Sequence, residues 1–439
     1  MNHEAMCQFV PSYLVEHLSG VDDDELTRCA TRTQRIDAAL VARRESRPEL
    51  TGIDADATTA VYTANHTEEL PGSLARADGS PPTGDDAVDE AYTGTGQVYG
   101  LYSAVFGRDS IDGDGSTVVA TVHYGQKYDN AFWDGCQMVF GDGDGVVFGR
   151  FTDPPDVLYH EYTHGVIQHT AGLTYSGQPG ALNESIADCF AAMTKQRVNG
   201  ESAQDADWLI GEGLFCPDVN ATALRSMKNP GTAYDDPRIG SDRQVGSMSE
   251  YVDTTDDNGG VHINSGIPNR AFYLAATGIG GNSWEGAGQI WYAALTGGEV
   301  STQTDFAGFA RATLSAARSL YGPDAPELDA VRAAWSEVGV GLRAGAPSNG
   351  SPVPPAGSIV VRRTGGVAGV TREETLDLAS NPEASELAQM LARMPEAGSQ
   401  PDQPDRFSYT FVVSGRSITV AEQDLTGELH ELVSKVLGS

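Results

Sequence analysis

Long apolar runs are missing from this 439-residue sequence. No window reaches the roughly 18 apolar residues that a membrane-crossing helix requires, so we expect no membrane partner. Residues 1–20 also lack the features of a secretory signal peptide, because they contain Glu4 and Glu16, no lysine or arginine, and no continuous apolar core. We therefore expect a protein that is cytoplasmic or is secreted by a route that uses no signal peptide.

Cysteine is scarce and widely scattered. An even set of closely spaced cysteines would indicate disulfides or a structural zinc site. The sequence has an odd number instead, namely Cys7, Cys29, Cys136, Cys189 and Cys216. We expect reduced thiols, several of them buried.

Lysine is nearly absent, with four residues in the whole chain, and acidic residues are in large excess. Asp and Glu number 61 against 28 Lys and Arg, which gives a net charge of -33 at pH 7. This balance argues against a nucleic-acid partner. It favours a halophilic protein, with a solvated surface adapted to high salt, where screening weakens the repulsion between like charges. Calcium binding is the competing explanation for part of the excess of Asp and Glu.

A short pattern of histidine and glutamate is typical of a catalytic zinc site. His160, Glu161 and His164 have the helical spacing that brings both imidazoles to one face, with the glutamate beside them. A chance match on an ordinary helix is the competing interpretation. However, Glu184 follows His164 by twenty residues and can supply a third ligand, leaving the fourth position for water.

Two neighbours of Glu184 can orient the zinc ligands. Asp188 lies one helical turn after Glu184, and Asn183 lies directly before it, so either can accept a hydrogen bond from a ligand imidazole. Zinc would polarise a peptide carbonyl and lower the pKa of water, and Glu161 would act as the general base. The pattern therefore predicts hydrolysis of peptide bonds.

From about residue 61 to residue 340 the chain resembles the thermolysin family of zinc metallopeptidases. Besides the zinc motif, four segments carry the resemblance: Tyr128–Trp133, Gly141–Gly145, Leu224–Met227 and Asp257–Gly266. The resemblance implies an α+β fold of two lobes, one strand-rich and N-terminal, the other helical and C-terminal. The zinc helix would lie at their junction, and the substrate cleft between the lobes.

The resemblance also assigns roles around the scissile bond. Tyr175 and His262 would donate hydrogen bonds to the carbonyl oxygen as it gains negative charge, with Asp257 holding the His262 ring. The alternatives are plain packing for Tyr175 and an ordinary loop role for His262. The residues implied to bind substrate are Asn130, Ala131 and Trp133 on an edge strand, Val157 and Leu224 in a pocket for large apolar side chains, and Arg225, which would bond the carbonyl beyond the scissile bond. The histidines without a comparable partner pattern are interpreted as structural: His66, His123, His169 and His430.

Calcium binding is where the sequence departs from the family. Asp156, Asp207 and Glu212 match carboxylates of a buried double calcium site, but Lys195 and Leu209 stand where further acidic ligands are expected. Because an ammonium group neutralises the same carboxylates, we expect no double calcium site. A single Ca²⁺ ion remains possible in the loop 109–115, where a plain Asp-Gly turn is the favoured interpretation.

The two ends of the chain resemble regulatory segments. Cys7–Leu18 resembles the short propeptide motif of protealysin-like peptidases, with Ser12 where proline is usual. Such a segment would lie in the cleft until cleavage between residues 43 and 60, and Cys7 would either pack there or supply a thiolate to zinc. Residues 357–439 resemble emfourin, a proteinaceous inhibitor of protealysin-like peptidases, through the turn at Gly365–Gly369. We expect this domain to be autoinhibitory, with an accessory or secretion-associated role as the alternative.

Together these motifs predict a zinc-dependent neutral metalloendopeptidase, made as a precursor, that cleaves peptides or proteins before large apolar residues. The expected division of the chain is propeptide 1–55, N-terminal lobe 56–155, C-terminal lobe 156–340, linker 341–356 and emfourin-like domain 357–439. The alternative is a catalytically silent zinc-binding module, which would need none of the four residues Glu161, Tyr175, Asp257 and His262.

Local patterning gives a coarse secondary structure. Helices are predicted at 22–44, 154–169, 183–198, 264–277, 306–321, 385–394 and 425–437. Strands are predicted in the alternating stretch 61–150, notably at 116–124, and at the start of 358–370, at 407–413 and at 417–420.

Overall fold

A computed structural model describes residues 7–43, 57–341, 358–365, 372–377, 407–413 and 416–421. The chain forms two units, residues Met1–Leu342 and Arg343–Ser439. In the described part of the chain, no helix combines the length and the apolar character that a membrane crossing demands.

The N-terminal lobe of the first unit is built on a six-stranded sheet with the strand order β1-β5-β6-β4-β2-β3. Its strands are β1 (Cys7–Gln8), β2 (Thr59–Thr63), β3 (Ser73–Ala77), β4 (Val118–Val122), β5 (Ala131–Trp133) and β6 (Met138–Phe140). The three neighbours β2, β4 and β6 run parallel, whereas β1, β3 and β5 pair antiparallel. Every residue of β4 is buried, as expected for a central strand rich in β-branched side chains.

A long helix, α3 (Asp86–Phe106), runs through the segment for which the sequence predicted only strands. Asp85 caps its first turn by accepting a hydrogen bond from the Val88 amide, and Gly107 ends it in the left-handed conformation, with φ of 66°. The prediction at 61–150 was therefore wrong over these residues. Glycine, threonine and tyrosine recur within this helix. None of them is a strong helix former, so the segment did not suggest a helix.

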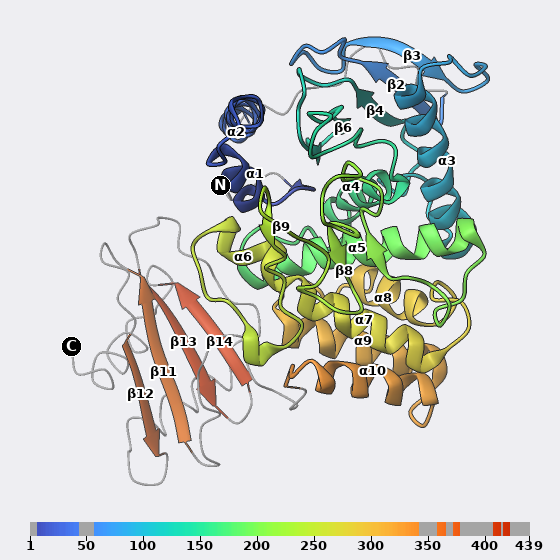
Figure 1. Cartoon of the computed structure of the whole chain (residues 1–439). Coiled ribbons are helices and arrows are strands. Elements are labelled where there is room, and N and C mark those ends of the chain that lie inside the picture. The colour runs from blue at the N-terminus through green and yellow to red at the C-terminus, as the bar shows by residue number, and fades with distance from the viewer. Residues whose placement is uncertain are drawn as a thin grey trace. The chain divides into compact units, whose positions relative to one another are not determined.

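The C-terminal lobe of the first unit is helical (Figure 1), and most residues of its two central helices are buried. Its helices are α4 (Pro155–Gln168), α5 (Gly177–Asn199), α6 (Asp257–Asn264), α7 (Gly266–Ile279), α8 (Ala287–Thr296), α9 (Phe306–Tyr321) and α10 (Pro326–Glu337), with the short 3-10 helix η1 (Met248–Glu250). Two small hairpins complete it, formed by β7 (Leu209–Ile210) with β8 (Arg225–Ser226) and by β9 (Asp235–Asp236) with β10 (Gly240–Ser241). The predictions of α4, α5, α7 and α9 are confirmed, and the two-lobed α+β fold is confirmed with them. No separate helix was predicted at α6, α8 or α10.

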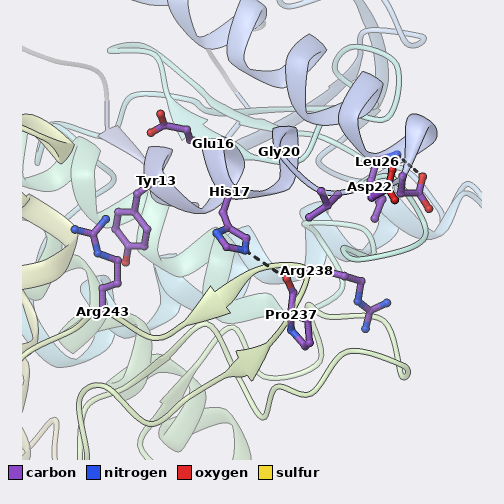
Figure 2. A pocket seen from close by; sticks show the side chains of 11 residues that line it. Tyr13, Glu16, His17, Gly20, Asp22, Leu26, Pro237, Arg238 and Arg243 are labelled. Carbon is purple, nitrogen blue, oxygen red and sulfur yellow. Dashed lines mark hydrogen bonds between the residues drawn. The ribbon is translucent and has the colours of Figure 1, made fainter.

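Two N-terminal helices lie on the first unit, α1 (Ser12–Ser19) and α2 (Asp24–Arg43). Ile36 of α2 is buried in a small cluster with Tyr124 and Tyr128 of the N-terminal lobe. Helix α1 contacts the other lobe, because the His17 imidazole lies 3.3 Å from the Pro237 carbonyl oxygen (Figure 2). Both residues line a cavity of about 750 Å³. The N-terminal segment therefore touches both lobes of the unit, and the helix predicted at 22–44 is confirmed.

The second unit contains a four-stranded antiparallel sheet with the order β12-β11-β13-β14. Its strands are β11 (Ser358–Gly365), β12 (Arg372–Asp377), β13 (Phe407–Val413) and β14 (Arg416–Ala421). Patterning predicted three of them and missed β12. The predicted helices at 385–394 and 425–437, almost all of the linker and most of the predicted cleavage region lie outside the described residues.

Candidate active site

Three buried side chains bring their donor atoms together at the junction of the lobes. His160 and His164 lie one turn apart on α4, and their Nε2 atoms are 2.9 Å apart. Glu184 of α5 places Oε2 3.4 Å from the His160 nitrogen and Oε1 3.4 Å from the His164 nitrogen. The Glu184 Oε2 atom is buried without a hydrogen-bond partner among the described residues. Two imidazoles and a carboxylate that converge in this way fit a zinc ion with one position left for water.

Two further side chains orient these imidazoles. Asp188 Oδ1 lies 2.8 Å from His160 Nδ1, and Asn183 Oδ1 lies 2.8 Å from His164 Nδ1. Each contact fixes the ring so that Nε2 faces the shared centre. Burial lowers the pKa of His164 to about 3.

Glu161 is buried directly beside this centre. Neither of its carboxylate oxygens has a hydrogen-bond partner within the part of the chain that is described. Burial raises the pKa of Glu161 to about 8. A carboxylate of raised basicity beside this centre has the position and the proton affinity that a general base of amide hydrolysis needs.

A second polar pair faces the same centre from the other side. The His262 Nδ1 atom lies 2.6 Å from Asp257 Oδ1, and its Nε2 atom lies 3.3 Å from the Tyr175 hydroxyl. Burial opposes the imidazolium, but the charges of Asp257 and Glu184 outweigh it and raise the pKa of His262 to about 9. The Tyr175 hydroxyl also donates a hydrogen bond to Glu184. The structure thus gives two hydrogen-bond donors at one edge of the site.

The backbone before His262 makes the Asp257 contact possible. Asn258, Gly259 and Gly260 all have positive φ, between 52° and 86°. A Cβ atom on Gly260 would come within 2.7 Å of the Asn264 side chain, so the tight path requires glycine there. The turn folds Asp257 back so that its second oxygen accepts the His262 amide at 2.8 Å.

The N-terminal segment of the chain lies along the edge strand of the cleft. Strand β1 pairs antiparallel with β5, and the Phe9 amide then donates to the Ala131 carbonyl at 3.0 Å. The Val10 amide donates to the Asn130 side-chain oxygen at 2.8 Å, and the Asn130 amide group returns a bond of 3.4 Å to the Val10 carbonyl. The structure therefore places Asn130 and Ala131 where they bind an extended backbone.

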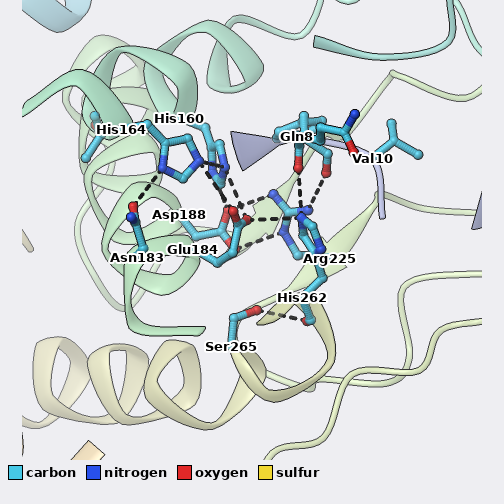
Figure 3. Close-up of polar contacts among 12 residues, drawn as sticks. Gln8, Val10, His160, His164, Asn183, Glu184, Asp188, Arg225, His262 and Ser265 are labelled. Atoms are coloured by element: carbon cyan, nitrogen blue, oxygen red, sulfur yellow. Dashed lines mark hydrogen bonds and ion pairs between the residues drawn. The ribbon is translucent and has the colours of Figure 1, made fainter. Parts of the chain in front are cut away.

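The peptide bond between Gln8 and Phe9 passes directly through the site. The Gln8 carbonyl oxygen lies 2.7 Å from His262 Nε2, and the Phe9 carbonyl accepts a hydrogen bond of 3.0 Å from Arg225 Nη1 (Figure 3). The Phe9 ring is fully buried, with its centroid 5.1 Å from the His160 ring. A Cβ atom on Gly211 would lie 3.1 Å from Leu224 and 3.4 Å from Phe9, so both side chains border that glycine.

One carboxylate connects the zinc-ligand set to the cleft wall. Arg225 donates two hydrogen bonds to Asp188, at 2.8 and 2.9 Å, and Asn269 donates a third at 2.8 Å. Asp188 therefore positions His160 and Arg225 together (Figure 3). Asn269 was not predicted from the sequence, because α7 is far from α5 in the sequence and only the fold brings them into contact.

Cys7, Trp133 and Val157 are all buried, in different surroundings. Cys7 packs in a buried cluster with Tyr175 and Val261, which matches the packing alternative. Among the described residues, the donor group at this centre consists of His160, His164 and Glu184, without Cys7. Val157 is buried on α4 in the main core, and Trp133 pairs with Cys7 through its backbone while its indole N–H bonds Gln168.

The predicted charge cluster is assembled around Lys195. Its ammonium nitrogen lies 3.1 Å from Asp207, 3.3 Å from Glu212 and 3.9 Å from the buried Asp156. It also donates to the Leu209 carbonyl at 3.2 Å. One cation thus contacts all three carboxylates that resemble calcium ligands. In the loop 109–115, Asp112 accepts the amides of Asp114 and Ser116, which is the pattern of a plain turn.

We predict that calcium does not affect the stability of the protein. Because the Lys195 ammonium group already lies among these carboxylates, adding calcium to calcium-free buffer that contains zinc should leave the thermal unfolding temperature unchanged. Lys195→Met should lower the free energy of unfolding by about 1 to 3 kcal/mol, since Asp156 is buried while its partners are partly exposed. Lys228→Met, at an exposed lysine, is the matched control. A calcium-dependent rise in unfolding temperature of the unchanged chain would contradict this account.

Three family models match the chain. The thermolysin metallopeptidase catalytic domain matches residues 33–168, and the thermolysin metallopeptidase alpha-helical domain matches residues 171–340. Emfourin matches residues 361–437.

Named relatives and a solved structure agree with these matches. An extracellular metalloprotease of Pectobacterium carotovorum subsp. carotovorum is 46% identical over 345 residues, which cover 78% of this chain and 99% of that protein. Protease PrtS of Photorhabdus sp. (strain Az29) is 41% identical over 343 residues, covering 76% and 92% of the two chains. The precursor of protealysin, a metalloproteinase from Serratia proteamaculans, has a similar structure, with a TM-score of 0.70 and 43% identity over 76% of this chain and all of its own.

Proposed function

Since this chain belongs to the thermolysin family and is a metalloendopeptidase, we propose that it cleaves before large apolar residues and is held latent by its own N-terminal segment. One observation carries the proposal. The Gln8–Phe9 bond crosses the site with its carbonyl at His262 and the next carbonyl at Arg225, as the scissile bond of a substrate would. The N-terminal segment thus serves as a guide to how a substrate binds.

The zinc ion that this family requires fits His160, His164 and Glu184, and when bound it polarises the substrate carbonyl and lowers the pKa of water. Glu161 accepts the proton of the attacking water and then delivers it to the leaving amine. Tyr175 and the protonated His262 donate hydrogen bonds to the carbonyl oxygen as negative charge develops there. Asp257 accepts the Nδ1–H of His262 and favours the imidazolium cation, in which Nε2 also carries a proton toward the substrate.

Substrate backbone recognition is proposed to follow the contacts of the N-terminal segment. Asn130 and Ala131 bind main-chain groups without regard to sequence, and Arg225 holds the carbonyl that follows the scissile bond. The side chain after the scissile bond would then occupy the place of the Phe9 ring. The buried surroundings of that ring favour large apolar side chains.

We predict that a peptide library treated with the processed enzyme is cleaved before Phe, Leu, Ile or Val, as mass spectrometry of the products would show. Loss of one buried methylene from the substrate side chain should reduce the free-energy preference for that substrate by about 1 to 3 kcal/mol. Leu224→Ala should relax the preference, whereas Leu74→Ala, at an exposed leucine of β3, should not. Preferred cleavage before Asp or Lys would refute the assigned pocket.

The C-terminal unit is proposed to be an inhibitory domain in the same chain. Its match to emfourin supports this role, and a tether gives it an effective concentration near the millimolar range at its own cleft. It would act after the N-terminal segment leaves, because β1 occupies the edge strand β5 until then. The alternative is an accessory domain without contact to the cleft.

We predict that truncation after Val340 raises the activity of the processed enzyme by about tenfold or more, since modest affinity suffices for a tethered inhibitor. The measurement is kcat/KM on a small peptide, for the full chain and for residues up to 340, both with the N-terminal segment removed. Adding the separate C-terminal fragment should lower the activity again. If neither truncation nor addition changes kcat/KM, the accessory role is correct.

We further propose that the enzyme acts outside the cell in saline surroundings. The name of the 46% identical relative describes an extracellular metalloprotease. The net charge of -33 is best tolerated where salt screens the repulsion between carboxylates.

A further inference from the structure

A second group of side chains that could hold a metal ion lies where the three parallel strands of the N-terminal lobe sheet end. His66, His123 and Asp142 follow the parallel neighbours β2, β4 and β6, respectively. Because the carboxyl ends of parallel strands meet at one edge of a sheet, these three loops converge there. From the sequence, both histidines were interpreted as structural, because they lie 57 positions apart and no local spacing links them.

The three side chains are close enough to share one ion. His66 Nδ1 lies 3.1 Å from Asp142 Oδ2, and His123 Nδ1 lies 2.9 Å from Asp142 Oδ1. One donor atom from each residue lies within 4.8 Å of the other two. The two imidazole rings are tilted by 58° with centroids 5.2 Å apart, so they do not stack. Each ring presents Nδ1 to the Asp142 carboxylate.

The backbone holds the two histidines in this arrangement. The His66 amide donates a hydrogen bond of 2.8 Å to the His123 carbonyl. His66 and His123 both have positive φ, of 62° and 55°. Few residues other than glycine adopt this conformation, so the loops fix the side-chain directions at a conformational cost.

Asp85 adds the outer contact that metal-binding histidines usually make. It lies 3.1 Å from His123 Nε2, the ring nitrogen that faces away from Asp142. A carboxylate on the outer nitrogen fixes the tautomer in which the inner nitrogen carries a lone pair. His160 shows the same pattern at the catalytic centre, where Asp188 bonds the nitrogen opposite the shared centre.

We propose that His66, His123 and Asp142 form a second metal site, which binds a divalent transition-metal ion of the Zn²⁺ type. Two imidazoles and one carboxylate favour such an ion over Ca²⁺ or Mg²⁺, which prefer oxygen ligands. A solvent molecule would complete the coordination, since the His66 side chain is 57% exposed. His66 and Asp142 also line a cavity of about 520 Å³ beside α2, through which an ion can enter.

The competing account is an ion-pair network in which a protonated His123 bridges Asp85 and Asp142. That network explains the His123 contacts without a metal. It gives His66 no comparable role, because His66 approaches the carboxylate already held by His123. Removal of the His66 imidazole therefore separates the two accounts.

The test measures zinc per chain on full-length protein that carries Glu161→Gln, so that the chain does not cleave itself. After equilibrium dialysis against a zinc buffer with low micromolar free zinc, elemental analysis should find one more zinc per chain than in the same protein with His66→Asn. Asparagine is chosen because it tolerates the positive φ of His66. His169→Asn, at an exposed histidine on the end of α4, should retain the additional zinc.

Asp142→Asn removes the proposed carboxylate ligand and keeps both histidines. This variant should also bind one zinc fewer than the parent protein. Circular dichroism and retention of the catalytic zinc show whether each variant is folded. Cobalt in place of zinc should give two sets of visible absorption bands in the parent protein and one in His66→Asn. Equal zinc content in the parent and both variants would overturn the second site and leave the ion-pair network.

Discussion

Glu161→Gln is expected to lower kcat/KM for peptide hydrolysis by roughly a hundredfold to ten-thousandfold, the range that general acid-base catalysis supplies. The carboxylate is buried beside the metal-binding set but donates no atom to it. The amide cannot take the proton from water, while it keeps the size of the side chain. Zinc content should therefore stay at the level of the parent protein, as elemental analysis would show.

Glu250→Gln, at an exposed position on η1, is the matched control and should leave kcat/KM unchanged. If maturation is self-catalysed, the Glu161→Gln chain should also accumulate in its unprocessed form. Near-normal turnover by a zinc-loaded Glu161→Gln protein would contradict the assignment of Glu161 as the general base.

Phe9→Ala is expected to open the cleft of the unprocessed chain. The Phe9 ring is fully buried between the His160 ring and the Arg225 guanidinium, whose centre lies 4.6 Å from the ring centroid. Truncation of a buried phenylalanine costs about 3 kcal/mol or more, and this free energy here holds the N-terminal segment in place. A fluorescent peptide that competes for the cleft should then bind on the order of a hundredfold more tightly.

The affinity is best measured in the Glu161→Gln background, where neither the probe nor the chain is cut. Glu16→Ala, at an exposed position of α1, removes a side chain of the same segment without touching the cleft and should leave the affinity unchanged. Equal affinities for the parent and the Phe9→Ala chain would show that the segment does not block the site.

The parts of the site that were predictable from the sequence are those whose spacing is local. His160 and His164 face the same way because they are one helical turn apart, and Glu184 and Asp188 are likewise one turn apart on α5. Asp257 and His262 are also close in sequence, although three positive φ angles are needed to bring them together. Such relations depend on a single element or turn.

The contacts that the sequence analysis missed depend on tertiary structure. Asn269 reaches Asp188 across the packing of α7 on α5, and His66 reaches Asp142 only because β2, β4 and β6 are parallel neighbours. Strand order is set by the packing of the whole lobe, so no single-sequence pattern reports it. The register of Gln8 and Phe9 on β5 likewise depends on the pairing of segments that lie more than a hundred residues apart.

The most direct test of the central claim is the hydrolysis of a peptide with one internal leucine by the N-terminally processed enzyme, before and after removal of its metal. We predict cleavage on the N-terminal side of the leucine, loss of activity when a chelator removes zinc, and recovery when one equivalent of zinc is returned. Hydrolysis that continues at the original rate in metal-free protein would contradict the assignment of His160, His164 and Glu184 as the catalytic metal site.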